Sequence, residues 1–508
     1  MIKKTFVIYI SQIYKSILPL IFIPLILGIL GAEKYGMLAF YYMLIGLLGL
    51  LDAGISGTFL KLISTNKNKK NNYKKVTILF FKVLILFSFI ALLIQLFFHF
   101  NSDFIVTKWL NTKIDYEESI FAIKAIGIII AFLYIKSYLV SFLYGMEKQE
   151  LVAVWNIIYS SFFYFGGYLI IRYIDNSLYG FFSLMKLISI FDIIVIFLIT
   201  ISIYIQHLNR LNKKGKKYLD TELEEKQEDL TFKNIFKFSI QLSGLSIIWV
   251  IATQIDKFVL SNYILLTEYA KYQIAVQLSS VIAIFSAPIS QILLPRLSRL
   301  YSEREFKHYS YIYCSSLYIF TYLLAPIIPY FFFFGNNLIS LWMGNEQLGN
   351  EINTYAKWLV SAAYIVGTMN FIFILLYSIN QLKHHFYAYL IYSLVTIPLS
   401  IFIAKYYGAL TSAKFIFIHT LLFMIIWFGW QIKKHFTKLV LSYLLSFIFV
   451  ILFSSLIFYL SSIILEPLSN LFIKAILPPI INLSLFAIIY LLVNKKLKIL
   501  LSKPTLTI

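Results

Sequence analysis

Long apolar runs recur along almost the whole chain, from Phe6 to Val493, and short polar segments separate them. A helix that crosses the hydrocarbon core of a membrane needs about 20 mostly apolar residues. These runs are too long for the strands of a transmembrane barrel, which need only about 10 alternating residues each. The pattern therefore predicts an all-α polytopic membrane protein with about fourteen transmembrane helices. The expected spans cover residues 6–29, 37–62, 77–99, 119–144, 151–173, 179–205, 236–260, 269–294, 310–334, 354–379, 386–404, 409–430, 439–463 and 471–493.

Basic residues gather on one side of these expected spans. With a cytoplasmic N-terminus, the cytoplasmic segments hold 29 lysines and arginines, and the outer segments hold 5. Lysine and arginine are enriched in the cytoplasmic loops of membrane proteins. We therefore expect both termini in the cytoplasm, and the formal net charge of +21 indicates orientation rather than a nucleic-acid partner.

One charged segment, 206–235, divides the chain between the sixth and seventh expected spans. It is short and highly charged, so we interpret it as a cytoplasmic linker rather than a folded domain. The predicted organisation is an N-terminal six-helix lobe over 1–205, the linker, and a second six-helix lobe over 236–430. Two further helices and a basic cytoplasmic tail follow over 431–508.

A weak internal repeat accompanies this division. Residues 31–36 read Gly-Ala-Glu-Lys-Tyr-Gly, and residues 266–272 read Leu-Thr-Glu-Tyr-Ala-Lys-Tyr. Each is a short outer connection between the first and second helix of its half. Membrane transporters often contain such duplicated halves, with the substrate site between them.

The sequence shows no signature of catalysis. It has no phosphate-binding Walker loop, its seven histidines lack metal-ligand spacing, and Cys314 is its single cysteine. The outer acidic group of Asp115, Glu117 and Glu118 is the remaining candidate, and we expect it to be a solvated loop. We therefore predict neither an enzyme nor a metal or cofactor site.

Charges deep within the expected spans are the most informative residues, because they are costly in a membrane and usually face an interior cavity. Lys15 lies about 15 Å into the first span, near the membrane midplane. Gln12 accompanies it, and Pro19 and Pro24 follow, so this helix is expected to be bent. A polar, bent first helix suggests a gating element that lines a cavity.

The remaining deep charges, Asp52, Lys136, Lys186 and Asp192, leave several roles open. Lys136 and Lys186 are further candidates to contact a substrate, whereas Asp52 is expected either to pair with a lysine or to carry a coupling proton. Asp256 and Lys257 are adjacent, so we expect them to point apart, with Lys257 reaching outward. A cavity whose deep charges are mainly cationic suits an anionic substrate such as a diphosphate.

Several segments resemble the Wzx-type polysaccharide repeat-unit flippases of the multidrug/oligosaccharidyl-lipid/polysaccharide exporter superfamily. In the first half the likeness includes Lys15-Ser-Ile-Leu-Pro-Leu-Ile-Phe-Ile-Pro24, the 31–36 connection and Leu51-Asp-Ala-Gly-Ile55. In the second half it includes Ile255-Asp-Lys-Phe-Val-Leu260, Tyr269 to Tyr272, Ala287-Pro288 and Leu294-Pro-Arg-Leu-Ser298.

The resemblance implies two six-helix lobes that form a V around a central cavity, with two extra helices. It implies translocation of undecaprenyl-diphosphate-linked oligosaccharides, such as O-antigen or capsule units, between the leaflets of the bacterial cytoplasmic membrane. Transport would proceed by alternating access coupled to H⁺ or Na⁺. We expect substrate to be bound by Lys15, Gln12, Lys136 and Lys186. We also expect the protein to be a monomer surrounded by membrane lipids.

The sites proposed for coupling or gating are Asp52, Asp256, Lys257, Pro19 and Pro24. Two related functions remain open: a cation-coupled antiporter of small molecules such as drugs, and a lipid II flippase. The lipid II flippases have a more arginine-rich cavity, whereas this chain has no arginine at its deep positions. A glycan polymerase is disfavoured because the longest expected outer loops, 100–118 and 335–353, are short.

Overall fold

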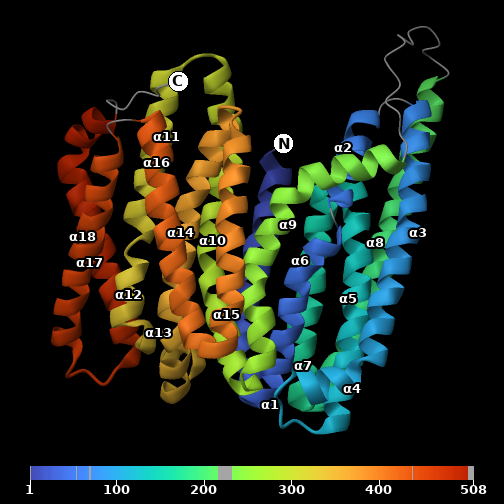
Figure 1. Ribbon diagram of the computed structural model, residues 1–508, viewed down its shortest axis with the longest axis horizontal. Coiled ribbons are helices and arrows are strands. Elements are labelled where there is room, and N and C mark those ends of the chain that lie inside the picture. The colour runs from blue at the N-terminus through green and yellow to red at the C-terminus, as the bar shows by residue number, and fades with distance from the viewer. Residues whose placement is uncertain (1, 53, 68–69, 216–231, 437–438, 502–508) are drawn as a thin grey trace. The chain divides into compact units, whose positions relative to one another are not determined.

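The computed structural model describes the chain except for residues 1, 53, 68–69, 216–231, 437–438 and 502–508, and the described residues form helices without a named strand (Figure 1). Much of the predicted linker lies outside the described residues. The first half contains α1 (Ile2–Asp52), α2 (Ile55–Asn66), α3 (Lys70–Phe100), α4 (Ser102–Phe104), the π-helix η1 (Ile105–Trp109), α5 (Tyr116–Gly145), α6 (Gln149–Ser161), the π-helix η2 (Phe162–Gly166), α7 (Gly167–Tyr173), α8 (Leu178–Gly215) and α9 (Phe232–Tyr263). The second half contains α10 (Leu266–Ser302), α11 (Phe306–Leu324), α12 (Ile327–Phe333), α13 (Gly335–Met343), α14 (Glu346–Ser378), α15 (Leu382–Phe423), the π-helix η3 (Met424–Phe428), α16 (Gly429–His435), α17 (Leu439–Leu465) and α18 (Leu471–Leu501).

Ten helices among the described residues are long and apolar enough to cross a membrane, so the chain is a multi-pass membrane protein. Two of them, Val7–Asp52 and Leu382–His435, are too long for one crossing of about 20 residues. Each contains a glycine with a positive φ angle, Gly31 (φ 78°) or Gly408 (φ 71°), at which two helices meet. Leu382–His435 therefore holds two expected spans, whereas Val7–Asp52 holds the first expected span and the first part of the second. The total of fourteen spans stays a prediction.

The second expected span, 37–62, was predicted as one helix and is interrupted. Helix α1 ends at Asp52, Gly54 adopts a left-handed conformation (φ 70°), and α2 begins at Ile55. The Asp52 carboxylate accepts hydrogen bonds from the backbone N–H of Ser56 (3.2 Å) and from its hydroxyl (2.5 Å). This carboxylate thus satisfies free donors in the first turn of α2. Within the expected outer loops, the chain forms the short helices α4, η1 and α13.

The chain divides into two compact units, Met1–Ala270 and Lys271–Ile508. The first unit extends beyond the predicted lobe of 1–205 because it includes α9, which packs against α1 and α2. Gly46 lies at this contact, and a Cβ atom there would stand only 2.8 Å from the Gln254 side chain. Small residues let membrane helices approach closely. The grouping into six, six and two helices stays a prediction.

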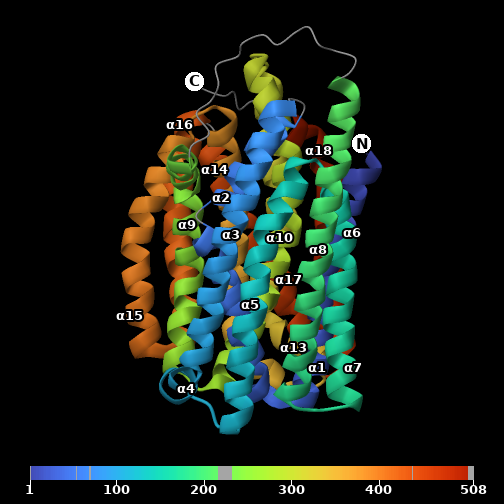
Figure 2. The same ribbon diagram turned by 90° about the vertical axis from the view of Figure 1, so that its right-hand side faces the viewer.

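Helix α5 is the centre of the first unit, and it packs against α3 and α8 (Figure 2). A column of aromatic rings fills the contact with α3. Phe80 stacks on Tyr138 at 4.4 Å, and Phe87 stacks on Tyr138 and Tyr134 at 4.2 and 4.7 Å between ring centroids. The Tyr138 hydroxyl donates to the Phe80 carbonyl at 3.0 Å, so the polar end of this buried side chain is satisfied.

Helix α14 has the same central role in the second unit. Of its most apolar stretch, 78% is buried, because α11, α12, α13 and α15 surround it. Tyr364 of α14 stacks on Phe320 of α11 at 5.8 Å and on Phe447 of α17 at 6.0 Å. Tyr313 of α11 donates to the Phe371 carbonyl at 3.2 Å.

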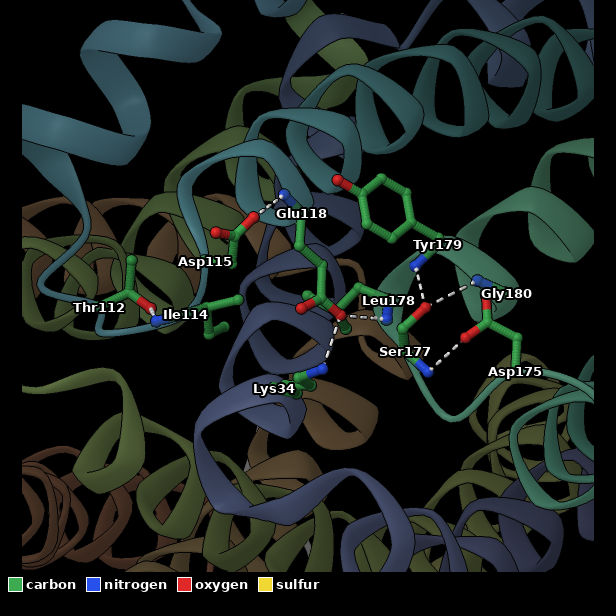
Figure 3. A network of polar contacts seen from close by, with 10 residues as sticks. All are labelled: Lys34, Thr112, Ile114, Asp115, Glu118, Asp175, Ser177, Leu178, Tyr179 and Gly180. Atoms are coloured by element: carbon green, nitrogen blue, oxygen red, sulfur yellow. Dashed lines mark hydrogen bonds and ion pairs between the residues drawn. The ribbon is translucent and has the colours of Figure 1, made fainter.

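A polar network joins three helix ends of the first unit around Glu118 (Figure 3). The Glu118 carboxylate pairs with Lys34 at 2.8 Å and accepts the backbone N–H of Leu178 at 2.6 Å. Asp115 accepts the Glu118 N–H at 3.1 Å and so caps α5. The expectation of a solvated acidic loop is therefore wrong for Glu118, which is 7% exposed, whereas Glu117 is exposed as predicted.

We expect Glu118→Ala to lower the free energy of unfolding by about 2 kcal/mol, because the substitution leaves the Lys34 ammonium and the Leu178 N–H without their acceptor. Thermal unfolding of the detergent-purified protein measures this effect. The matched control is Glu117→Ala, an exposed neighbour whose substitution is expected to change stability by less than about 0.5 kcal/mol. Equal stability of the two variants would contradict a structural role for Glu118.

Candidate functional site

A buried ion pair lies deep within the first unit. The Lys136 ammonium on α5 donates to the Asp192 carboxylate on α8 at 2.7 Å, and these side chains are 12% and 2% exposed. The second oxygen of Asp192 accepts the indole N–H of Trp155 on α6, also at 2.7 Å. Both oxygens of the carboxylate therefore have a charged or polar donor, as a buried acid requires.

Aromatic and charged groups extend this cluster toward α1. The Tyr159 ring of α6 lies under the Lys136 ammonium, 4.2 Å from its centroid, which adds a cation–π interaction. Lys15 of α1 interacts electrostatically with both Lys136 and Asp192. Helix α1 is held against α6 by hydrogen bonds that fix its depth and rotation: Ser11 to the Ala153 carbonyl at 2.8 Å and Tyr14 with Ser161 at 2.7 Å.

Lys15 and Gln12 differ from the ion pair because both are exposed at the surface of the first unit. Their spacing of three residues places them on the same face of α1. A charged side chain at this depth needs water or an ionic partner, since the hydrocarbon core provides neither. Lys15 and Gln12 therefore place a charged and an amide side chain on one exposed face of α1.

Lys186 lies apart from this cluster. Its ammonium stands over the Phe121 ring of α5, 4.4 Å from the centroid. Phe121 is fifteen residues from Lys136 on the same helix, which corresponds to about 22 Å. The structure thus brings Lys15 and Lys136 together and does not bring Lys186 to them.

Asp256 and Lys257 do not point apart, which corrects the expectation from their adjacency. Their side chains form an ion pair at 3.4 Å and are 5% and 12% exposed. The lysine stem folds back along α9, because its ammonium also donates to the carbonyl of Thr253, one turn earlier. Lys257 is therefore neutralised within the helix and does not reach outward.

The prolines of α1 do not interrupt it. Pro19 and Pro24 both lie inside the helix, and the residue with non-helical backbone angles is Gly31. The bend expected at the two prolines, and a role for them in gating, stay predictions. Asp52 accepts hydrogen bonds from Ser56 as described above, and its role in coupling also stays a prediction.

Sequence reasoning singled out Lys136 and Asp192 as deep charges but did not pair them. They are separated by 56 positions and lie on different helices, so only the packing of α5 against α8 brings them together. It also missed Trp155 and Tyr159, which lie in an apolar run where aromatic residues are expected anyway. The presence of a deep acid on one span and a deep base on another was the sequence signal that could have indicated this ion pair.

We expect Asp192→Ala to lower the free energy of unfolding by about 3 kcal/mol, because it leaves the Lys136 ammonium buried without its partner. The double variant Lys136→Ala/Asp192→Ala should lose less free energy of unfolding than the two single variants lose together, by at least about 1 kcal/mol. Thermal unfolding of the four proteins measures this coupling. Strictly additive effects would contradict an ion pair that stabilises the fold.

Comparison of the fold with solved structures found transporters that superimpose on this chain. The lipid II flippase MurJ in its inward closed conformation has a TM-score of 0.69 and 18% identity, with 96% of this chain and 99% of that chain covered. A multidrug resistance MATE family transporter of the MOP superfamily, in its inward-facing conformation, has a TM-score of 0.62 and 13% identity. That match covers 82% of this chain and 93% of the other. These likenesses show the fold.

Comparison of the sequence found a relative from Shigella flexneri that carries the name "Putative O-antigen transporter". It is 23% identical over 325 residues, which cover 64% of this chain and 72% of the relative. The family described as polysaccharide biosynthesis protein, Polysacc_synt, matches residues 1–301, more than half of the chain. The chain therefore belongs to this family of polysaccharide biosynthesis proteins.

Proposed function

We propose that this protein translocates undecaprenyl-diphosphate-linked oligosaccharides from the inner to the outer leaflet of the bacterial cytoplasmic membrane, with both termini in the cytoplasm. Three findings support the proposal. The chain belongs to a polysaccharide biosynthesis family, a relative carries the name of an O-antigen transporter, and the fold is shared with MurJ, a lipid II flippase. The observation that carries it is Lys15, an exposed lysine in the first expected span that interacts electrostatically with the buried pair of Lys136 and Asp192.

Lys15 is the proposed contact for the diphosphate. Lys136 is already neutralised by Asp192, whereas Lys15 is an exposed residue that interacts electrostatically with this pair. A diphosphate that approaches Lys15 would replace the water around that ammonium with charged oxygens, an exchange that suits a compact cation. Because the Asp192 carboxylate offsets the charge of Lys136, Lys15 supplies the uncompensated positive charge of this cluster.

The apolar and polar parts of the proposed substrate need different environments during transport. The polyprenyl tail is apolar and remains in the bilayer, whereas the diphosphate and the glycan are polar and need a hydrated route. Alternating access around this route, driven by H⁺ or Na⁺, returns the protein to its starting state. A membrane transporter of this kind needs no catalytic residue, because no covalent bond changes.

Replacing Lys15 with Ala is expected to lower glycan export at least tenfold at normal protein levels, because one charge-assisted contact to the diphosphate contributes about 1.5–3 kcal/mol. Lys15→Arg should retain part of the activity, since it keeps the charge. The matched control is Lys82→Ala, which removes an exposed lysine of α3. Unchanged export by the Lys15→Ala variant would contradict the phosphate contact.

The substrate class can be tested with purified protein in vesicles. We expect accelerated flipping of a fluorescent undecaprenyl-diphosphate oligosaccharide, measured by quenching the probe in the outer leaflet, and no pH-driven efflux of a cationic dye. The undecaprenyl-monophosphate analogue should be flipped more slowly, because it offers fewer phosphate oxygens to Lys15. Dye efflux without flipping of the glycan lipid would instead support the small-molecule antiporter.

A further inference from the structure

The second unit contains a long antiparallel hairpin that turns at Gly408 and returns through η3 and α16 (Figure 1). Ring contacts define which residues face one another across it. His385 lies opposite Trp427, with centroids 6.3 Å apart, and Tyr389 lies opposite Phe423 at 5.1 Å. Further along, the Tyr392 hydroxyl and the Nδ1 atom of His419 are hydrogen-bonded at 2.6 Å.

These contacts fix a register that places polar residues in layers. The facing pairs His385–Trp427 and Tyr389–Phe423 are one helical turn apart along each of the two helices of the hairpin. Counted along the sequence, the same step leads in one direction to Gln381, the N-cap residue of α15, and to Gln431 of α16, and in the other direction to Ser393 and His419. A stripe of polar side chains therefore follows the hairpin from its predicted cytoplasmic end to His419.

Most of this stripe is buried and unsatisfied. Gln431 is 1% exposed and His385 is 4% exposed. Six buried atoms of the stripe have no hydrogen-bond partner among the described residues: Gln381 Oε1, His385 Nδ1, Ser393 Oγ, Trp427 Nε1, and both Nε2 and Oε1 of Gln431. Buried polar atoms are normally paired with protein or with ordered water. The clustering of these atoms on one hairpin points to a hydrated path.

The pair at the end of the path can change its protonation without losing its hydrogen bond. When the His419 imidazole is neutral at Nδ1, that atom accepts the Tyr392 hydroxyl proton. When Nδ1 is protonated, it donates instead to the Tyr392 oxygen. His419 lies eleven residues from Gly408, or about 16 Å along the helix, so the pair is deep within the span.

We propose that His419 is the proton-carrying site of this protein, and that the polar stripe is the water-filled route by which its proton exchanges with the cytoplasm. The inference rests on the proposed transport function and names its coupling ion and residue. In each cycle the imidazole would take up one proton from the outer side and release the same proton through the stripe. The mixture of donors and acceptors favours water over a bare metal cation, since Trp427 Nε1 and Gln431 Nε2 cannot coordinate Na⁺.

Several titratable or charged groups lie on the elements around the stripe. Helix α14 packs against α15 and contributes Phe373 beside His385, with Tyr377 in ring contact with Phe373. On α15 itself, the titratable neighbours are Tyr389 and Tyr392. The last turn of α16 adds Lys433, Lys434 and His435 at the end of the route.

Histidine-labelled protein without substrate gives a direct test by nuclear magnetic resonance. The His419 signal, assigned by its loss in His419→Gln, is expected to titrate between pH 5 and pH 8, the range in which imidazoles change charge. Tyr392→Phe should shift this titration, because it removes the group that serves both protonation states. An invariant His419 signal over that range would overturn the inference.

Transport in vesicles tests whether the proton is coupled. A pH gradient, acidic outside, is expected to stimulate wild-type flipping of the glycan lipid, whereas His419→Gln and His385→Gln should lose at least tenfold of that stimulation. The neighbours His384 and His385 provide a matched pair, because His384 is exposed and His385 is buried. His384→Gln should therefore respond like wild type.

The two proposals fail in different ways. If the pH gradient stimulated flipping equally in the wild type and in the His419→Gln variant, the proton site would be overturned. The same holds if a Na⁺ gradient alone stimulated wild-type flipping. Either result would leave the proposed flippase function standing. Absence of glycan-lipid flipping in the wild type would overturn the proposed function. In that case the titration of His419, which needs no substrate, still decides whether the hairpin binds and releases a proton.

Discussion

A charged or polar group inside a bilayer has no surrounding water, so it must be paired within the protein or face a hydrated space. The deep residues of this chain meet this constraint in different ways. Lys136 and Asp192 form a cross-helix pair, and Asp256 and Lys257 form a pair along one helix. Lys15 is an exposed residue that interacts electrostatically with the first of these pairs. The paired charges are therefore structural, whereas Lys15 is the charge proposed to contact the substrate.

The second unit satisfies the same constraint with neutral groups. The hairpin of α15, η3 and α16 holds amide, indole, hydroxyl and imidazole atoms that lack partners among the described residues. Neutral polar atoms cost less to bury than ions, and water can satisfy them without a fixed countercharge. A stripe of such atoms suits a mobile proton better than a phosphate. The lysines of the first unit are the groups proposed above to contact the anion.

Glycines and aromatic rings arrange these groups. Gly31 and Gly408 adopt the positive φ angles at which two helices meet, and Gly54 separates α1 from α2 where hydropathy alone would continue one helix. The stacked rings around Tyr138 and Tyr364 hold the central helices α5 and α14 in place. The deep polar residues depend on this packing, because a shift of one turn would move Lys136 away from Asp192.

Hydropathy and the spacing of apolar runs by themselves determined the fold class, since only helices satisfy their own backbone along such runs. They also located the deep charges, including Lys15, Lys136 and Asp192, because a charge is conspicuous in an apolar segment. Pairing was decided by the tertiary structure alone. Whether a deep lysine is neutralised, as Lys136 is, or exposed, as Lys15 is, depends on which helix packs beside it, and that contact joins residues far apart in the sequence.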